Sequence, residues 1–242
     1  MRKHRSVLLG VVCFLGLAMS AAALEAEPAK PKKEKARKGT EAVKSPKRPK
    51  GQKSPTGAKA EEGWISLFNG KDLTGWKGEG KAEWKAVDGM LVGKQGPDNA
   101  PGDLLTEKSF KDFELTCTYK CTWPCNSGIW FRYQNANLAY QADVLDWKNP
   151  VAFTGSLYSP GYPKGQTFLV IHLDKNLEKR DDWNTFKITA QGDHIVIVLN
   201  GKTTADVHDS HVAEGKIGFQ VHPGAEFAPM SITVKEIKIK PL

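Results

Sequence analysis

The chain has 242 residues and a formal net charge of +8 at pH 7, and its basic residues are concentrated near the N-terminus. Residues 1–62 hold 15 Lys and Arg against 6 Asp and Glu, whereas residues 63–242 hold 20 against 21, a net charge of −1. A nearly neutral segment lacks the basic surface that follows a phosphate backbone. We therefore expect no nucleic acid partner for the C-terminal part of the chain.

The first residues are typical of an export signal. Arg2, Lys3 and Arg5 precede an apolar run over residues 7–23 that ends in small residues, which is the pattern that a signal peptidase recognises. The sequence therefore predicts a signal peptide over residues 1–23 and a periplasmic or extracellular location. An uncleaved membrane anchor is the alternative, because the apolar run has about 17 residues.

Residues 24–62 are rich in Lys, Pro and Ala and contain almost no large apolar side chain. Such a segment cannot bury enough surface to offset the entropy of ordering, so we predict a disordered linker. A solvated spacer is the simpler interpretation of its charge. An electrostatic contact with an anionic cell-envelope polymer or a membrane surface is the alternative.

The composition changes at Gly63, beyond which all seven Trp residues lie. About 180 residues are enough for one domain with a large core, so we predict a single domain over residues 63–242. Short alternating or apolar runs, separated by turns rich in Gly, Asn and Asp, predict strands. The predicted strands are 64–68, 90–92, 113–120, 129–133, 140–145, 167–172, 184–189, 195–199, 216–220 and 232–239.

No run in this domain has a convincing helical period. Ten strands of this length cannot lie in one flat sheet without exposing an apolar face. We therefore predict an all-β fold, a two-sheet antiparallel sandwich of the jelly-roll type. The long connection over residues 147–165, which contains several Pro and Gly, is expected to form a rim over one sheet.

Residues 126–132 and 140–146 alternate apolar and polar side chains and predict a hairpin with one polar face. If Phe131 pairs with Ala142, the apolar side chains share one face of the sheet and the polar ones share the other. A slip by one residue would bury the polar set, at a cost of several kcal/mol if its groups are unpaired. The polar set contains an aromatic plate, a cation, an amide and a carboxylate: Trp130, Arg132, Gln141 and Asp143.

Three Cys residues follow the predicted signal peptide. Cys117 and Cys121 lie roughly 13 Å apart along an extended strand, which is beyond the reach of a disulfide. A bridge between Cys121 and Cys125 is conceivable, because Trp123-Pro124 can bend the chain. The same spacing disfavours a zinc site.

Eight motifs, in order along the globular part, resemble one protein family. They are Leu67-Phe-Asn-Gly-Lys-Asp-Leu-Thr-Gly-Trp76, Asp88-Gly-Met-Leu-Val92, Leu104-Leu-Thr106, Asp112-Phe-Glu-Leu115, Asn126-Ser-Gly-Ile-Trp-Phe-Arg132, Trp183-Asn-Thr185, Leu199-Asn-Gly201 and Ile217-Gly-Phe-Gln-Val-His222. The domain resembles the domain of unknown function 1080 family, described as 3-keto-disaccharide hydrolases. The resemblance implies a concanavalin A-like or laminin G-like jelly roll and a carbohydrate substrate.

A sugar with a ketone at carbon 3 has an acidified hydrogen at carbon 2, and loss of this hydrogen permits elimination of the group on carbon 1. This route needs a base near carbon 2, a donor or cation at the ketone oxygen and an acid at the leaving oxygen. We predict Asp143 and His222 as base and acid, in either order, with Arg132 as the cation. In the family pattern a Glu and a Gln often stand where this chain has Gln141 and Asp143.

The other predicted site residues are hydroxyl-binding or stacking groups near the same strands. They are Trp130, Gln141, Asn126, Gln220, Tyr158 and Asn184. Trp130 is expected to offer its ring to a sugar while its N–H stays available for a hydroxyl, with core packing as the alternative. We predict no metal or other cofactor, although the loop His208-Asp-Ser-His211 has a composition that binds metals in other proteins.

Structural interpretations compete with several of these roles. Arg132 could form a cross-strand salt bridge with Asp143, and Asp146 is more simply a turn cap before Pro150. A non-catalytic carbohydrate-binding module is the alternative for the whole domain, because sandwiches of this type also serve as lectins.

Overall fold

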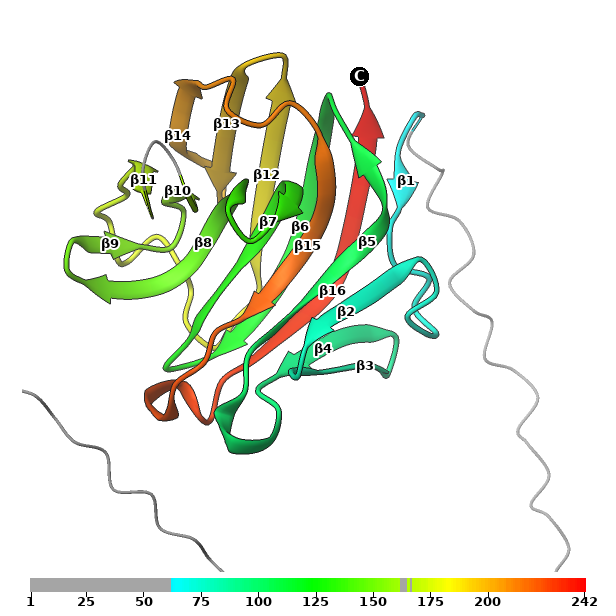
Figure 1. The fold of residues 1–242 in the computed structure, drawn as a ribbon, viewed down its shortest axis with the longest axis vertical. Coiled ribbons are helices and arrows are strands. Elements are labelled where there is room, and N and C mark those ends of the chain that lie inside the picture. Colours follow the sequence, from blue (N-terminus) through cyan, green and yellow to red (C-terminus); the bar gives the residue numbers. More distant parts are fainter. Residues whose placement is uncertain (1–61, 162–164, 166) are drawn as a thin grey trace, which may run out of the picture. The chain divides into compact units, whose positions relative to one another are not determined.

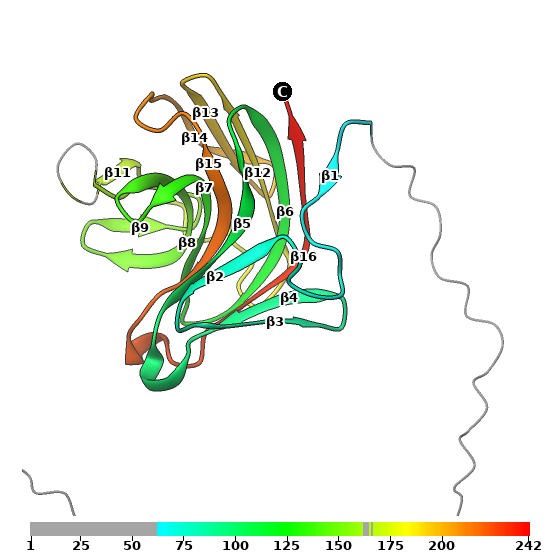
Figure 2. The ribbon, with the colours of Figure 1, turned by 45° about the vertical axis from the view of Figure 1, so that its right-hand side comes forward.

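The computed structural model describes residues 62–161, 165 and 167–242, and these residues form two antiparallel sheets packed face to face (Figure 1 and Figure 2). The predicted signal peptide and all of the predicted linker except Glu62 lie outside the described residues. No helix within the described residues is long and apolar enough to cross a membrane. The predicted all-β sandwich is confirmed.

The first sheet has the strand order β14-β13-β12-β6-β16-β4-β3, and β1 also pairs with β16. The C-terminal strand β16 therefore lies in the middle of this sheet. Its strands are β1 (Ile65–Ser66), β3 (Glu83–Val87), β4 (Met90–Lys94), β6 (Phe113–Thr122), β12 (Asn184–Gln191), β13 (His194–Leu199), β14 (Lys202–His208) and β16 (Ser231–Pro241).

The second sheet has the order β11-β10-β8-β7-β15-β5-β2, and β9 also pairs with β8. Two short 3-10 helices, η1 (Pro97–Asn99) and η2 (Ala225–Phe227), lie in connections. The strands of this sheet are β2 (Trp76–Gly80), β5 (Gly102–Phe110), β7 (Asn126–Asn135), β8 (Leu138–Lys148), β9 (Val151–Phe153), β10 (Leu157–Ser159), β11 (Thr167–Val170) and β15 (Gly215–Val221).

Alternation of side chains explains why these strands form one core between the sheets. On β6, every second side chain from Phe113 to Cys121 is fully buried, while those between are partly exposed. The inner face of β8 contributes Tyr140, Ala142 and Val144 to the same core. Because successive side chains of a strand point to opposite faces, the side chains of β8 between these three point away from the core, to the outer face of the sheet.

Each of the ten predicted strand segments overlaps an observed strand, but six strands were missed: β2, β3, β5, β9, β10 and β14. Two physical reasons account for three of them. The strands β9 and β10 have only three residues each, too few for a period to be visible. In β5, Leu104 and Leu105 are consecutive buried residues on opposite faces, so the strand does not alternate.

The pairing of β7 with β8 differs from the predicted register by two residues. Phe131 pairs with Tyr140 rather than with Ala142, and Ile129 pairs with Ala142. Near the turn, however, Asn135 pairs with Leu138, which is the predicted register. The difference arises because β7 contains a bulge with two extra residues between these points, and a shift by two leaves the faces of the sheet unchanged.

The bulge overturns the predicted position of Arg132, whose φ is +50° and whose side chain is fully buried. Arg132 does not join Asp143 on the outer face, and it forms no salt bridge with it. The guanidinium lies at one end of the sandwich and donates to Lys111 O (2.9 Å), Gly192 O (2.9 Å), Val212 O (3.2 Å) and Asp112 Oδ1 (3.2 Å). Arg132 therefore joins three connections between strands.

Cys121 and Cys125 form a disulfide with a Cα–Cα distance of 6.5 Å, which is one of the alternatives that the sequence left open. Cys117 is a buried free thiol. The predicted rim over residues 147–165 contains β9 and β10, both of which pair with β8. This connection therefore borders the outer face of the second sheet, as predicted.

Replacing the buried cation tests its structural role. We expect Arg132→Met to lower the free energy of unfolding by about 3–5 kcal/mol, because three carbonyl oxygens and Asp112 lose their buried donor. The measurement is urea unfolding at neutral pH. Lys85→Met is the matched control, since Lys85 is exposed and pairs only with Glu83 among the ion pairs described; its cost should stay below about 1 kcal/mol. Equal stabilities of the two variants would contradict the structural role of Arg132.

Candidate functional site

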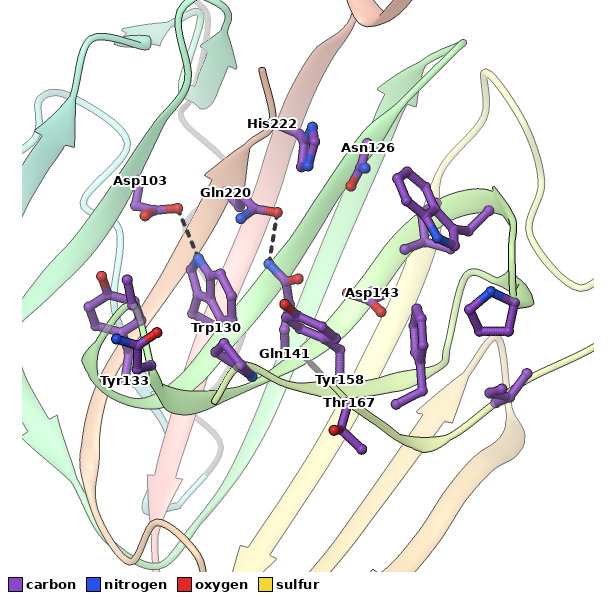
Figure 3. A pocket seen from close by; sticks show the side chains of 18 of the residues that line it. Asp103, Asn126, Trp130, Tyr133, Gln141, Asp143, Tyr158, Thr167, Gln220 and His222 are labelled. Carbon is purple, nitrogen blue, oxygen red and sulfur yellow. Dashed lines mark hydrogen bonds between the residues drawn. The ribbon is translucent and has the colours of Figure 1, made fainter. Parts of the chain in front are cut away.

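A cavity of about 680 Å³ opens on the outer face of the second sheet, under the segment from β9 to β11. Its polar residues come from four neighbouring strands or their ends, and Figure 3 shows them around one hollow. The polar residues from these four strands or their ends include Asp103, Asn126, Gln141, Asp143, Gln220 and His222. Of the nine predicted site residues, seven line this cavity, and Arg132 and Asn184 do not.

Strand pairing explains why these residues meet. Asp143 on β8 pairs with Gly128 on β7, Gly128 pairs with Gln220 on β15, and Gln220 pairs with Asp103 on β5. These four positions form a row across the sheet, and side chains of one row point to the same face. The backbone N–H of His222 donates to Asn126 O (3.3 Å), which adds the next row.

Gly128 leaves room in the middle of the row. A Cβ atom at this position would lie 2.6 Å from Cγ and Cδ of Gln141. The Gln141 amide therefore passes close to Gly128 and donates to Gln220 Oε1 (3.2 Å, Figure 3). A larger residue at position 128 would displace this amide, so the glycine is required by a close approach and not by its backbone angles.

Asp143 is the most unusual group of the cavity. Its side chain is only 2% exposed, and its Oδ2 atom has no hydrogen-bond partner among the described residues. Burial raises the pKa of the Asp143 carboxyl well above its ordinary value, because a desolvated carboxylate is costly. The neutral carboxyl therefore persists to a higher pH than in a free Asp side chain, and in this form it can donate a proton or a hydrogen bond.

The chain behind Asp143 is held by a buried network. The N–H of Asp143 donates to Ser156 O (3.0 Å), and Gly155 N–H donates to Asp143 O (2.9 Å). The neighbouring Thr154 hydroxyl is hydrogen-bonded to Glu178, and burial raises the pKa of Glu178 to about 7. His172 Nδ1 lies 2.7 Å from Thr154 O. These contacts fix the backbone of β8 at the point where it carries Asp143.

His222 lies across the cavity from Asp143 at the end of β15 (Figure 3). Its Nδ1 atom is 2.7 Å from the carbonyl oxygen of Pro223. A carbonyl oxygen can only accept, so Nδ1 carries the proton and Nε2 carries the lone pair in the neutral ring. The ring packs edge-on against Trp147 and Phe227, with centroid distances of 6.4 and 5.6 Å.

Asp103 is a cavity residue that the sequence reasoning missed. Its Oδ1 atom accepts a hydrogen bond from Trp130 Nε1 (2.9 Å, Figure 3). Burial raises the pKa of Asp103 to about 6, although the bond from Trp130 opposes this shift. The available signal was the position of Asp103 beside the core residue Leu104, but it lies in β5, a strand that was not predicted.

The contact with Asp103 corrects the expectation for Trp130. The indole N–H is already bonded, so it is not available for a sugar hydroxyl. The ring is 4% exposed and packs beside Tyr133 and Tyr158, with centroid distances of 5.6 and 6.5 Å. Trp130 therefore forms part of the cavity floor and exposes little of its ring to a ligand.

Two further candidates from the sequence, Asn184 and the loop that follows His208, do not line the cavity. Asn184 was predicted to bind substrate, but it is 1% exposed and its amide donates to the carbonyl oxygens of Lys179 and Asp182; it stabilises a turn. His208, the last residue of β14, pairs with Asp193 at 3.0 Å. Within the part of the chain that the structure describes, no three His, Cys, Asp or Glu residues are grouped to hold a metal ion.

Several known proteins resemble this chain. A curated 3-keto-disaccharide hydrolase from Bacteroides thetaiotaomicron is 35% identical over 172 residues, covering 61% of this chain. The chain spans 59% of the length of that relative. Among solved structures, a presumed glycosyl hydrolase from Parabacteroides distasonis matches with a TM-score of 0.56 and 20% identity, covering 74% of this chain and 99% of that one.

The fold is also similar to that of a protein described as a carbohydrate-binding module. This module, CBM66 from Bacillus subtilis, matches with a TM-score of 0.55 and 18% identity, covering 69% of this chain and 95% of that chain. Likeness at this level of identity concerns the fold alone. The family of 3-keto-alpha-glucoside-1,2-lyase-like domains matches residues 63–240, which include both sheets and the whole cavity. The chain therefore belongs to the 3-keto-alpha-glucoside-1,2-lyase-like family.

Proposed function

We propose that this protein is a carbohydrate-active enzyme that cleaves the glycosidic bond of 3-keto-glycosides in the cavity of the second sheet. The observation that carries the proposal is the presence in one cavity of Asp143, a buried carboxyl whose Oδ2 has no hydrogen-bond partner among the described residues, and His222, whose Nε2 bears a lone pair. An acid and a base that face one hollow are what an elimination reaction requires. Family membership and the 3-keto-disaccharide hydrolase relative support the same chemistry.

The geometry favours one assignment of the two roles. His222 Nε2 takes the proton from carbon 2 of the keto-sugar, and the electron pair of that C–H bond forms the C1–C2 double bond. The bond from carbon 1 to the glycosidic oxygen breaks, and the neutral Asp143 carboxyl gives its proton to the leaving oxygen. Addition of water to the resulting enone then completes net hydrolysis and releases the 3-keto-sugar.

The ketone oxygen needs a hydrogen-bond donor, and Arg132 is too far into the end of the sandwich to serve. Tyr158 and Asn126 line the cavity and carry suitable donors. Burial, with a smaller effect of Asp143, raises the pKa of Tyr158 to about 12. Its hydroxyl therefore stays protonated at neutral pH and can stabilise a developing enolate.

A non-catalytic carbohydrate-binding module is the second candidate. The observation that favours it is the lining of the cavity, which contains no Lys or Arg side chain among the described residues. An enolate formed in this cavity would have no fixed positive charge beside it among the described residues. Binding of neutral sugar hydroxyls does not need such a charge. Calorimetry with unoxidised oligosaccharides separates the two functions, since the module binds them and the enzyme requires the ketone.

We also propose that the protein acts outside the cytoplasm. The support is the sequence of residues 1–23, which has the charge and apolar pattern of an export signal. The linker over residues 24–62 would then be a solvated spacer, with an anionic envelope surface as a further partner. Detection of the mature N-terminus after expression in a bacterial host tests the cleavage.

Turnover of a 3-keto-disaccharide tests the proposed reaction. We expect the purified protein to release a free 3-keto-sugar, detected by NMR in D₂O, with deuterium at carbon 2 because the proton is lost to solvent through His222. Asp143→Asn and His222→Ala should each lower kcat by about 10²-fold or more, the usual contribution of a positioned acid or base.

The control for these variants is His208→Ala, which changes an exposed histidine outside the cavity. It should keep full turnover. Thermal unfolding of all three variants separates loss of chemistry from loss of fold. Wild-type rates in both cavity variants, or the absence of turnover with any keto-sugar, would remove the proposal.

The raised pKa of Asp143 predicts opposite effects on activity and stability. As the pH rises through the pKa of Asp143 in the folded protein, the acid form disappears and kcat falls. The folded-state pKa lies above the unfolded value, so the folded state binds the proton more tightly and wild-type stability decreases as pH rises above about 4. Asp143→Asn lacks this titration. Its melting temperature relative to wild type should therefore increase with pH, and an unchanged difference from pH 4 to 8 would contradict the burial argument.

A further inference from the structure

The segment that carries His222 is an exposed turn. Strand β15 ends at Val221, and the turn His222-Pro223-Gly224 leads from it to η2. Pro223 is exposed, and Gly224 has a φ of +118°, a backbone angle that favours glycine. Because core packing does not fix such a turn, the directions of its carbonyl groups depend on hydrogen bonds to the rest of the protein.

Gln95 supplies two of these hydrogen bonds. It follows β4 of the first sheet and is 8% exposed. Its Nε2 atom donates to His222 O (2.8 Å) and to Gly224 O (2.9 Å). The connection after β4 and the connection after β15 lie next to each other at one end of the sandwich (Figure 1 and Figure 2). Gln95 does not line the cavity, so its influence on the site passes through the turn.

The orientation of the Gln95 amide follows from its partners. Both are carbonyl oxygens, which only accept, so the NH₂ group faces the turn. The Oε1 atom of Gln95 is then buried and has no hydrogen-bond partner among the described residues. A buried acceptor without a partner costs stability. The two donated bonds are therefore what this side chain contributes, and both of them hold the turn that carries His222.

The two bonds lie on either side of the carbonyl group that accepts from the imidazole. Pro223 O is 2.7 Å from His222 Nδ1, and Gln95 holds the carbonyl groups before and after it in the chain. The proline ring also fixes φ at this position. The Pro223 carbonyl therefore has little freedom to turn away from the ring. The hydrogen bond at one ring nitrogen decides which nitrogen of a neutral histidine carries the proton.

We infer that Gln95 is a positioning residue for His222: it holds the turn so that Nδ1 keeps its proton and Nε2 keeps its lone pair. The inference rests on the proposed function, in which Nε2 is the base. Gln95 itself exchanges no proton with the substrate. Without its amide, the turn loses both anchors and the Nδ1–H group loses a fixed acceptor. The proton then moves to Nε2 in part of the molecules, and these molecules lack the base.

Ring ¹⁵N NMR of the labelled protein tests this inference without any substrate. The spectrum is recorded at a pH at which the ring is neutral, and the His222 signals are assigned with His222→Ala. We expect the wild-type protein to carry the proton on Nδ1. Gln95→Leu should raise the population of the Nε2–H form relative to the Nδ1–H form by roughly tenfold, the equivalent of one hydrogen bond.

Gln134→Leu is the matched control. The Gln134 amide also donates to a backbone carbonyl oxygen, that of Glu214 (2.9 Å), but it lies outside the cavity and the turn. This variant should leave the His222 signals unchanged. Gln95→Glu is a second test variant of nearly the same size as the wild-type side chain. It donates at most one hydrogen bond, so it should shift the proton in the same direction as Gln95→Leu.

Kinetics with a 3-keto-disaccharide should show the same dependence. We expect Gln95→Leu to lower kcat by about tenfold or more while KM changes by less than about threefold, because the base is affected and the cavity lining is not. Gln134→Leu should keep both values. Thermal unfolding shows which variants are folded.

A wild-type ring spectrum in either folded Gln95 variant, the same change in Gln134→Leu, or a proton on Nε2 in the wild-type protein would overturn the inference. Loss of fold in both Gln95 variants would also overturn it, since the role would then be in stability alone. If the tautomer shifts but the wild-type protein cleaves no keto-sugar, the positioning role stands and the enzymatic function falls. If the wild-type protein cleaves keto-sugars and Gln95→Leu retains both its kcat and its tautomer, the positioning role falls and the enzymatic function stands.

Discussion

The pairing of β7 with β8 is the constraint on which the cavity depends. It buries Ile129, Phe131 and Tyr140 in the core, and burial of these side chains outweighs the cost of leaving polar groups on the other face. Any shift by one residue would exchange the two faces, whereas the bulge shifts the register by two and preserves them. The position of Asp143 opposite Gly128 follows from this pairing.

Asp143 and Arg132 illustrate two ways in which a fold holds an ionisable group away from water. Arg132 has four acceptors around its guanidinium and works as a connector between loops. Asp143 has a raised pKa, and its Oδ2 atom has no hydrogen-bond partner in the part of the chain that the structure describes. A buried polar group that lacks a partner costs stability, and groups of this kind are concentrated at functional sites. The contrast favours a chemical role for Asp143 and a structural one for Arg132.

The cavity also combines features of enzymes and of carbohydrate-binding proteins. Its aromatic and amide groups would suit a lectin, while a neutral acid facing a histidine suits proton transfer. The cavity depends on the outer face of the second sheet and on the rim strands β9 and β10, which pair with β8. Because such rims are connections rather than core strands, they can vary between relatives without change to the fold.

The sequence by itself determined the all-β class, the two-sheet sandwich and most of the polar cavity face, because period-two alternation and turn residues are local signals, and its eight motifs indicated the family. Seven of the nine candidate residues line the cavity for this reason. Only the tertiary structure decided the position of Arg132, since a bulge depends on how three connections pack around it, and the role of Asp103, since its partner Trp130 is two strands away. The raised pKa of Asp143 likewise depends on burial by segments distant in the sequence, which no local pattern reports.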